Sequence, residues 1–238
     1  MPYSLGWLKK EKIMYPNFKK MIIYIILFSS LIINPFKLEA IDYRKGVSFG
    51  INSTWFVYND TPDLWPGLWQ EEKNRILLSG SIFFEYSPFS KIFFCPSFRF
   101  IQLGNKINFD YENNPILVEK GFQITLTYLT LFLKIDYEVL SKPNFYFIIG
   151  PEMGYLLKSS VKTTYIDDTE RKESITNALN RFHFSGAIGI GSEIFDFNDD
   201  KIFVEFLYFH GINNVGKESD WATNWKTREI NLSAGIKF

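Results

Sequence analysis

Two histidines are the side chains in this chain whose type most invites catalysis. His183 and His210 are the only histidines in the sequence. A histidine held between a serine and an acid would indicate a protease or an acyltransferase. No Gly-x-Ser-x-Gly motif, which often presents such a serine, accompanies them. We therefore expect both histidines to have a packing role, as polar rings at the height of a membrane boundary, and we predict no catalytic residue.

A set of charged residues offers a second kind of chemistry. They fall on the less apolar face of segments that alternate in polarity, so they would face the inside of a closed sheet. They are Glu85, Arg99, Lys134, Asp136, Glu152, Glu193, Glu205, Glu229 and Lys237. Such a set could line an ion path or a small polar site. An eight-stranded barrel has room inside only for side chains, and an unpaired buried charge is costly. We therefore predict a salt-bridged plug.

Metal and cofactor chemistry has little support in the sequence. The single cysteine, Cys95, has no partner for a disulfide, and we expect it to be a passive residue of a strand. No Cys/His cluster has the spacing of a zinc site, and no phosphate-binding loop occurs. We predict no metal and no cofactor.

The elements that would position these residues are strands. From Ile230 to Phe238 every second residue is apolar, which is the period of a strand with unlike faces. The same alternation predicts strands over eight ranges: Gly46–Phe56, Ile76–Tyr86, Ile92–Gln102, Phe122–Tyr137, Phe145–Leu157, Phe182–Ile194, Ile202–Ile212 and Arg228–Phe238. Pro96 predicts a bulge or a local irregularity in the third range, and residues 167–180 could form a short helix.

The connections between these ranges alternate between long and short. This alternation is typical of outer-membrane barrels, with short turns in the periplasm and long loops outside. We predict an all-β fold: an eight-stranded antiparallel up-and-down transmembrane β-barrel. A soluble ligand-binding barrel is the alternative, and it would turn the apolar faces inward around a cavity.

The first forty residues have the pattern of an export signal. Lys19 and Lys20 precede an apolar run from Met21 to Ile33, and a breaker and Ala40 follow. We predict a signal peptide over residues 21–40 and a barrel domain over residues 41–238. Residues 1–20 are then an over-extended start or the basic region of the signal, with Met1, Met14 or Met21 as the true start. A single anchoring helix is the alternative.

Composition agrees with a membrane barrel but does not require one. Lys and Arg number 26, and Asp and Glu also number 26, so nothing favours nucleic acid as a partner. Aromatic residues make up 18% of the chain, which suits girdles at two lipid interfaces. Aromatic residues in the predicted loops could form a girdle or a binding surface outside the membrane; they are Trp65, Trp69, Tyr111, Tyr165, Trp221 and Trp225.

Three segments resemble the PorT-like family of outer-membrane β-barrels. They are Tyr146–Leu157 with its Gly-Pro pair and Gly-Tyr-Leu-Leu ending, His183–Glu193 with its alternating glycines, and Glu205–Asn214 with its Tyr-x-x-Gly corner. The segment Tyr128–Phe132 lacks the Glu and Pro of the family pattern, and Leu207 stands where Arg is common. The resemblance implies an outer-membrane location, and some members serve protein secretion or gliding.

These observations together favour a non-enzymatic barrel of the bacterial outer membrane. We expect a filled lumen, contact with outer-membrane lipid, a monomer, and a structural or interaction role through extracellular loops that could bind a protein. The alternative is an outer-membrane enzyme with its site at the rim of the loops.

The membrane assignment predicts a simple behaviour of residues 41–238. The chain should fold in detergent but not in plain buffer, because its apolar face needs lipid or detergent. Gel electrophoresis should show a mobility that changes on heating. A monomer that folds in buffer without detergent would contradict the assignment.

Overall fold

The computed structural model describes residues 43–58, 69–109, 119–141, 144–197, 200–217 and 225–238. The predicted signal segment, Trp65, Tyr111 and Trp221 lie outside the described residues. Within them, no helix is both long enough and apolar enough to cross a membrane.

The described residues form strands and one turn of 3-10 helix. The strands are β1 (Tyr43–Tyr58), β2 (Trp69–Phe89), β3 (Ile92–Phe109), β4 (Glu119–Ser141), β5 (Asn144–Tyr165), β6 (Glu170–Glu173), β7 (Phe182–Phe197), β8 (Asp200–Gly211) and β9 (Trp225–Lys237). The 3-10 helix η1 covers Thr176–Ala178.

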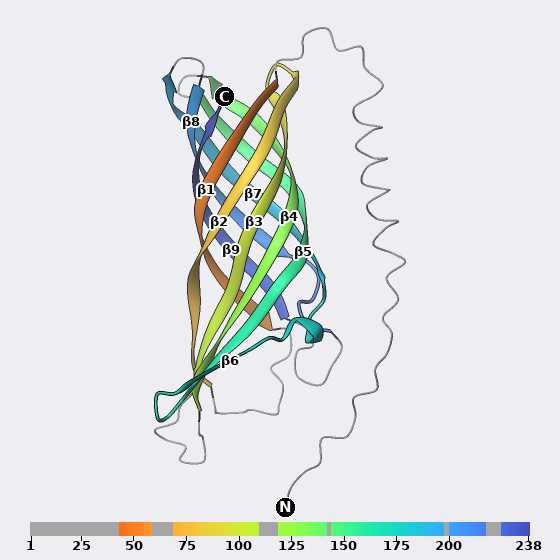
Figure 1. Ribbon diagram of the computed structural model, residues 1–238. Coiled ribbons are helices and arrows are strands. Elements are labelled where there is room, and N and C mark those ends of the chain that lie inside the picture. The colour runs from red at the N-terminus through yellow and green to blue at the C-terminus, as the bar shows by residue number, and fades with distance from the viewer. Residues whose placement is uncertain (1–42, 59–68, 110–118, 142–143, 198–199, 218–224) are drawn as a thin grey trace, which may run out of the picture. The chain divides into compact units, whose positions relative to one another are not determined.

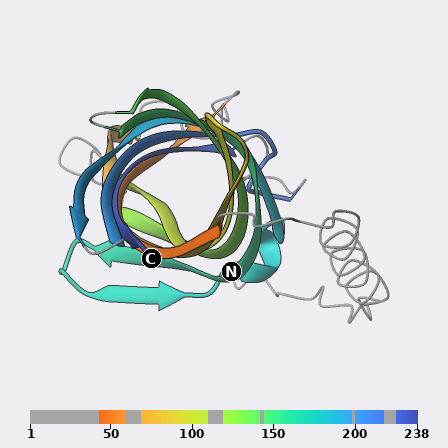
Figure 2. The same cartoon turned by 90° about the horizontal axis from the view of Figure 1, so that it is seen from above.

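Eight of these strands close into a barrel. Each pairs antiparallel with its neighbour in the order β4-β3-β2-β1-β9-β8-β7-β5, and β4 also pairs with β5. Strand β6 pairs only with the end of β5, so it lies outside the ring (Figures 1 and 2). The first and last strands meet along thirteen residue pairs, from Gly46–Lys237 to Tyr58–Trp225. This closure leaves the ring without a free edge, and it confirms the predicted fold class.

The strands extend further than the alternation predicts, mainly on one side of the ring. β4 has 23 residues and β5 has 22, whereas β8 has 12. Much of the predicted loop 158–181 is therefore strand: β5 runs on to Tyr165 and returns as β6, and only η1 is helical. The predicted helix over residues 167–180 is reduced to that single turn, because residues 170–173 pair with β5 instead.

The structure has no bulge at Pro96, but it has the local irregularity that was also predicted: between the pairs Phe83–Ser97 and Tyr86–Phe94, Pro96 and Cys95 have no partner on β2. Pro96 pairs with Leu133 of β4 in unbroken register. On the other side, the pairs Phe83–Ser97 and Tyr86–Phe94 have the same offset. A residue in an antiparallel ladder bonds to only one of its two neighbouring strands, so a missing N–H removes a single bond. The register shifts between β2 and β3 occur elsewhere in β2. The widest interruption of the ladder among them lies between Asn74 and Ser79.

The turn between β5 and β6 uses two adjacent aspartates. Asp168 adopts φ 64°, a left-handed conformation that Asp tolerates. The Thr169 hydroxyl and backbone N–H both donate to Asp167 Oδ1, and these bonds hold the pKa of Asp167 below its usual value. The hairpin is therefore closed by its own local hydrogen bonds.

The outer surface of the ring is apolar, as the alternation predicts. Phe49 is 76% exposed and Phe84 and Phe147 are each 53% exposed, although all are large hydrophobic residues. Ile190 and Leu232, which a soluble barrel would bury inside, are likewise on the outside. An exposed apolar surface of this extent requires lipid. The soluble-barrel alternative is thereby rejected.

Aromatic residues gather at the short-turn end of this outer surface. Tyr43 pairs with Tyr86, and Tyr86 in turn pairs with Phe94 and stacks on it at 5.5 Å between ring centroids. Further round the ring, Tyr137 of β4 pairs with Phe147 of β5. Aromatic residues gathered near one end of the apolar surface are typical of the girdle of a membrane barrel.

At the other end, the outer surface changes from apolar to polar along one line of the register. Gln102 of β3 pairs with Thr127 of β4, which pairs with Lys158 of β5. Below this line β4 points Leu129, Leu131 and Leu133 outward; above it the outward residues are Thr125 and Gln123. We call β3 from residue 102, β4 up to residue 127, β5 from residue 158 and β6 the extracellular sheet, because the long connections lie at this end.

The boundary predicts effects of different size for two arginine substitutions on β4. Leu133→Arg places a charge within the apolar band and should lower the free energy of unfolding by about 2–4 kcal/mol, whereas Gln123→Arg should change it by less than about 1 kcal/mol. Urea-dependent unfolding in lipid vesicles measures both. Equal effects of the two substitutions would contradict the boundary.

Candidate functional site

The interior of the barrel holds two groups of paired charges, one above the other. The first surrounds Arg99 of β3. Its guanidinium pairs with Glu152 of β5 through Nη1 and with Glu229 of β9 through Nη2, the latter at 3.0 Å. It also lies over the Phe209 ring, 4.2 Å from the ring centroid. This one cation therefore joins three strands that are distant in sequence and pairs with two buried carboxylates.

Glu152 is fully satisfied by its neighbours. The Thr130 hydroxyl donates to its Oε2 at 2.9 Å, and the Ser185 hydroxyl donates to its Oε1 at 3.3 Å. A buried carboxylate is tolerated only with such partners. The Glu152 carboxylate is therefore stabilised by hydroxyl groups of β4 and β7 as well as by the Arg99 guanidinium.

The second group, nearer the short turns, is built around two lysines. Lys134 pairs with Glu205, and with Asp136 at 3.2 Å. Lys237 pairs with Glu85 at 2.5 Å and with Glu193 at 3.0 Å. Further contacts complete the group: Tyr146 donates to Glu205, Lys201 pairs with Glu193, and Arg44 approaches Glu85.

Every charged residue that the sequence assigns to the lumen therefore lies in these two groups. Each of them is buried and has a partner of opposite charge. The members are Glu85, Arg99, Lys134, Asp136, Glu152, Glu193, Glu205, Glu229 and Lys237. The arrangement fills the cross-section instead of lining a path; a void of about 20 Å³ between the groups has room for about one water.

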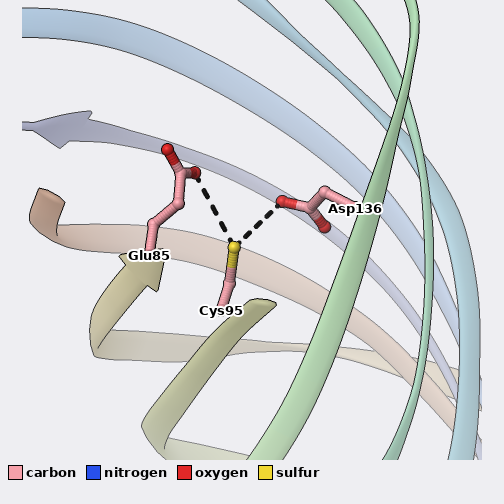
Figure 3. Close-up of side chains that lie close together, drawn as sticks. All are labelled: Glu85, Cys95 and Asp136. Carbon is pink, nitrogen blue, oxygen red and sulfur yellow. Dashed lines mark hydrogen bonds between the residues drawn. The ribbon is translucent and has the colours of Figure 1, made fainter. Parts of the chain in front are cut away.

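Cys95 lies among the carboxylates of the second group (Figure 3). Its thiol donates to Asp136 Oδ2 at 3.3 Å and approaches Glu85 Oε2 at 3.7 Å. A thiol and two carboxylates that lie this close are a set that could hold a metal ion. Lys134 and Lys237 already contact the same two carboxylate oxygens, and their ammonium groups supply the positive charge that a metal would bring. We therefore assign the three residues to the ion-pair network.

A polar cavity of about 200 Å³ opens at the short-turn end. Charged and amide side chains of several strands line it, among them Glu85, Asp136, Asn144, Glu193 and Lys237. Asp136 Oδ1 and Asn144 Oδ1 are buried there without a hydrogen-bond partner among the described residues. Both are acceptors, and the cavity has room for several waters that can donate to them.

The extracellular end of the lumen is closed by an apolar plug, which sequence reasoning missed. Inward residues of the walls meet residues of two connecting segments, and all are buried. They are Phe56, Ile101, Leu103, Ile124, Leu126, Tyr128, Leu156, Leu179, Val215 and Trp225. Only Leu179 and Val215 come from outside the strands, and no periodicity marks them.

Backbone hydrogen bonds hold these two connecting segments over the mouth. Asn180 N–H donates to Val215 O at 2.8 Å, and Val215 N–H donates to Trp225 O at 2.7 Å. The Asn180 side-chain amide donates to Asn214 O and Gly216 O, each at 2.9 Å. One asparagine therefore ties the segment after η1 to the segment before β9.

The two histidines do not meet, and one is not where the sequence placed it. His210 is exposed on the outside of β8 and contacts the Tyr208 hydroxyl. His183, predicted as a ring at the lipid boundary, is instead buried inside the barrel against Tyr128, with Nε2 3.5 Å from Thr227 Oγ1. It lies at an inward position of β7, which alternates with Phe182 and Phe184 outside.

Trp225 also differs from its prediction. Predicted as a girdle or loop-surface residue, it is 5% exposed and stacks on Phe56 inside the apolar plug. Its position follows from β9 beginning three residues earlier than predicted, which puts it on the inner face opposite Tyr58. Tyr165, also assigned to a loop, ends β5.

A comparison with protein families agrees with this architecture. The family model described as "Outer membrane protein beta-barrel domain" matches residues 40–216. No curated protein matches the chain. Similar solved structures include Ail of Yersinia pestis in complex with the heparin analogue sucrose octasulfate, with 10% identity over 83% of this chain and 99% of that chain, and a TM-score of 0.42.

Two further solved structures have a comparable likeness. Neisserial surface protein A has 10% identity, covers 84% of this chain and 98% of its own, and has a TM-score of 0.38. The outer membrane protease OmpT of Escherichia coli has 10% identity, covers 84% of this chain and 99% of its own, and has a TM-score of 0.36.

The Arg99 group predicts a marked asymmetry between single and combined substitutions. Arg99→Met leaves Glu152 and Glu229 buried without their cation and should lower the free energy of unfolding by about 3–5 kcal/mol. The triple variant with Glu152→Gln and Glu229→Gln removes the unpaired charges and should recover most of that loss. Unfolding in urea measures both. A triple variant no more stable than Arg99→Met would contradict the assigned pairing.

Proposed function

The chain belongs to the family of outer-membrane protein β-barrel domains, and we propose that it is a sealed, non-enzymatic member that acts by presenting its extracellular sheet to a partner. Its place in the bacterial outer membrane follows from the family and the lipid-facing surface. The observation that carries the proposal is the contrast between a filled lumen and a tall polar wall outside the membrane.

The filled lumen argues against transport. Paired charges occupy the middle and the short-turn half, and the apolar plug occupies the extracellular half. A solute would have to break buried ion pairs and then cross a dry cluster. Either step is costly, because unpaired buried charges and polar solutes in an apolar core are both unfavourable.

The arrangement of polar side chains argues against catalysis at the rim. His183 faces the interior and His210 faces outward, so the two rings lie on opposite sides of the wall. The carboxylates nearest His183 in the network are held by Arg99. A convergent group of histidine, acid and serine at the mouth would have favoured the alternative of an outer-membrane enzyme.

The wall beyond the membrane supports an interaction role. A transmembrane strand needs about 9–11 residues, whereas β4 and β5 have 23 and 22. Most of the excess lies in the extracellular sheet, whose inner face packs on the plug through Ile124, Leu126 and Val161. The sheet is therefore backed by packed side chains, and the side chains of its outer face point away from the plug.

A link to secretion machinery is the finer part of the proposal. It rests on the resemblance of Tyr146–Leu157, His183–Glu193 and Glu205–Asn214 to PorT-like barrels. On that basis the partner would be a protein of a secretion or gliding assembly at the cell surface.

Photocrosslinking in intact cells tests the interaction role. A crosslinking residue at Gln123 should give discrete adducts with a macromolecule, because this position lies on the outer face of the extracellular sheet. The same residue at Leu133, on the same face of β4 within the lipid band, is the matched control and should give lipid adducts only.

Conductance provides the second arm. The purified protein in planar bilayers should give no stepwise currents. Adducts at Gln123 no more abundant than those at Leu133 would overturn the interaction role, and stepwise currents would overturn the sealed lumen.

A further inference from the structure

The outer face of the extracellular sheet and of the neighbouring part of β2 carries a row of lysines that no prediction from the sequence identified. Lys73 of β2 pairs with Lys106 of β3, which pairs with Gln123 of β4. Gln123 pairs with Lys162 of β5, which pairs with Lys172 of β6. We call Lys73, Lys106, Lys162 and Lys172 the lysine row. Adjacent strands are about 4.8 Å apart, so the row spans about 19 Å.

The lysine row points away from the plug. The neighbours of Lys106 along β3, Asn105 and Ile107, are 1% and 0% exposed and face inward. Val161, next to Lys162, packs against the apolar plug. Successive side chains of a strand alternate between faces, so Lys106 and Lys162 face outward.

The row is electrostatically unfavourable by itself. Lysines directly opposite each other on paired strands destabilise a sheet, and Lys162 lies opposite Lys172 in this way. Glu170 offsets part of this repulsion, because its Oε1 forms an ion pair with Lys162 Nζ at 2.6 Å. Among the residues that the structure describes, Lys106 and Lys172 have no carboxylate within ion-pair distance. An anion supplied from outside would remove the repulsion.

The position of the row identifies the source of that anion. Lys106 lies four residues beyond Gln102, which is on the boundary line, and Lys162 lies four residues beyond Lys158. Four residues of a tilted strand correspond to a height of about 10 Å above the apolar band. The row is on the same outer face that contacts lipid chains below the line, so the molecules that stand beside it are the headgroups of the outer leaflet.

We propose that the lysine row binds the phosphate groups of lipopolysaccharide standing against the outer face of β2 to β6. The ammonium groups act as point charges toward phosphate oxygens. Lys158 on the boundary line adds a further cation at the level of the deepest phosphates. The proposal rests on the interaction role of the extracellular sheet and names the chemistry of one partner.

The test measures phosphate-dependent retention of lipopolysaccharide by the detergent-folded full chain. Deep-rough lipopolysaccharide and its dephosphorylated form are the probes, with heparin as a soluble polyanion. The variant Lys106→Gln/Lys162→Gln removes the centre of the row. The matched control, Lys45→Gln/Lys91→Gln, removes two exposed lysines at the short-turn end. Heat-modifiable mobility shows that each variant is folded, and Lys106→Arg/Lys162→Arg keeps the charge.

The wild type, the arginine variant and the control should bind phosphorylated lipopolysaccharide alike. The glutamine variant should bind at least about tenfold more weakly, since each basic residue near an anionic surface contributes about a fivefold factor. Dephosphorylated lipopolysaccharide should bind every variant weakly. Unchanged binding by the glutamine variant would overturn the proposal. Heparin binding as tight as that of lipopolysaccharide and equally dependent on the row would also overturn it, in favour of a soluble polyanion.

These outcomes are separate from those of the proposed function. The lysine row is outside the lumen, so its substitution leaves both the ion pairs and the plug in place. Stepwise currents from the wild type would refute the sealed lumen without affecting phosphate binding. Protein adducts at Gln123 together with unchanged lipopolysaccharide binding by the glutamine variant would refute the lysine row and leave the interaction role in place.

Discussion

The structure depends on the cost of burying a charge inside a barrel too narrow for bulk water. The apolar side chains of each strand face lipid, so the alternate positions, with their carboxylates and amines, must face inward. A carboxylate in that space is tolerated only when a cation or several hydrogen-bond donors meet it. Arg99, Lys134 and Lys237 meet that requirement, each by contacting two acids from different strands. Because their partners come from strands far apart in sequence, the same ion pairs also link strands across the ring.

The two ends of the lumen are filled by side chains of different kinds. Toward the short turns the interior is ionic, and a polar cavity there gives water access to Asp136 and Asn144. Toward the long connections the interior is apolar, because the walls continue beyond the membrane and their inner face needs a core of its own. Leu179 and Val215 complete that core from the connecting segments. Within one closed sheet, an apolar core like that of a soluble protein therefore lies at the extracellular end, and a lumen filled by ion pairs lies within the membrane.

The extracellular sheet follows from the same division. Its inner face packs on the plug, whereas its outer face changes character where the membrane ends. Leu129, Leu131 and Leu133 give way to Thr127, Thr125 and Gln123 on the same side of β4. The lysines that gather on that side are brought side by side by strand pairing, and they present a surface suited to anionic headgroups.

The sequence by itself determined the strand cores, their inward and outward faces, and the closed ring, because a period of two assigns every residue of a strand to one face. It also identified the charged residues of the lumen, from Glu85 to Lys237. It misjudged the ends of β4 and β5, since polar residues that face water on a strand look the same as residues of a loop. It also misplaced His183 and Trp225, whose surroundings depend on where a strand begins. Only the tertiary structure decided which charges pair, that Leu179 and Val215 close the mouth, and that Lys73, Lys106, Lys162 and Lys172 form a row. Those facts depend on the register between strands, and register is set by the packing of the whole ring, which no local pattern contains.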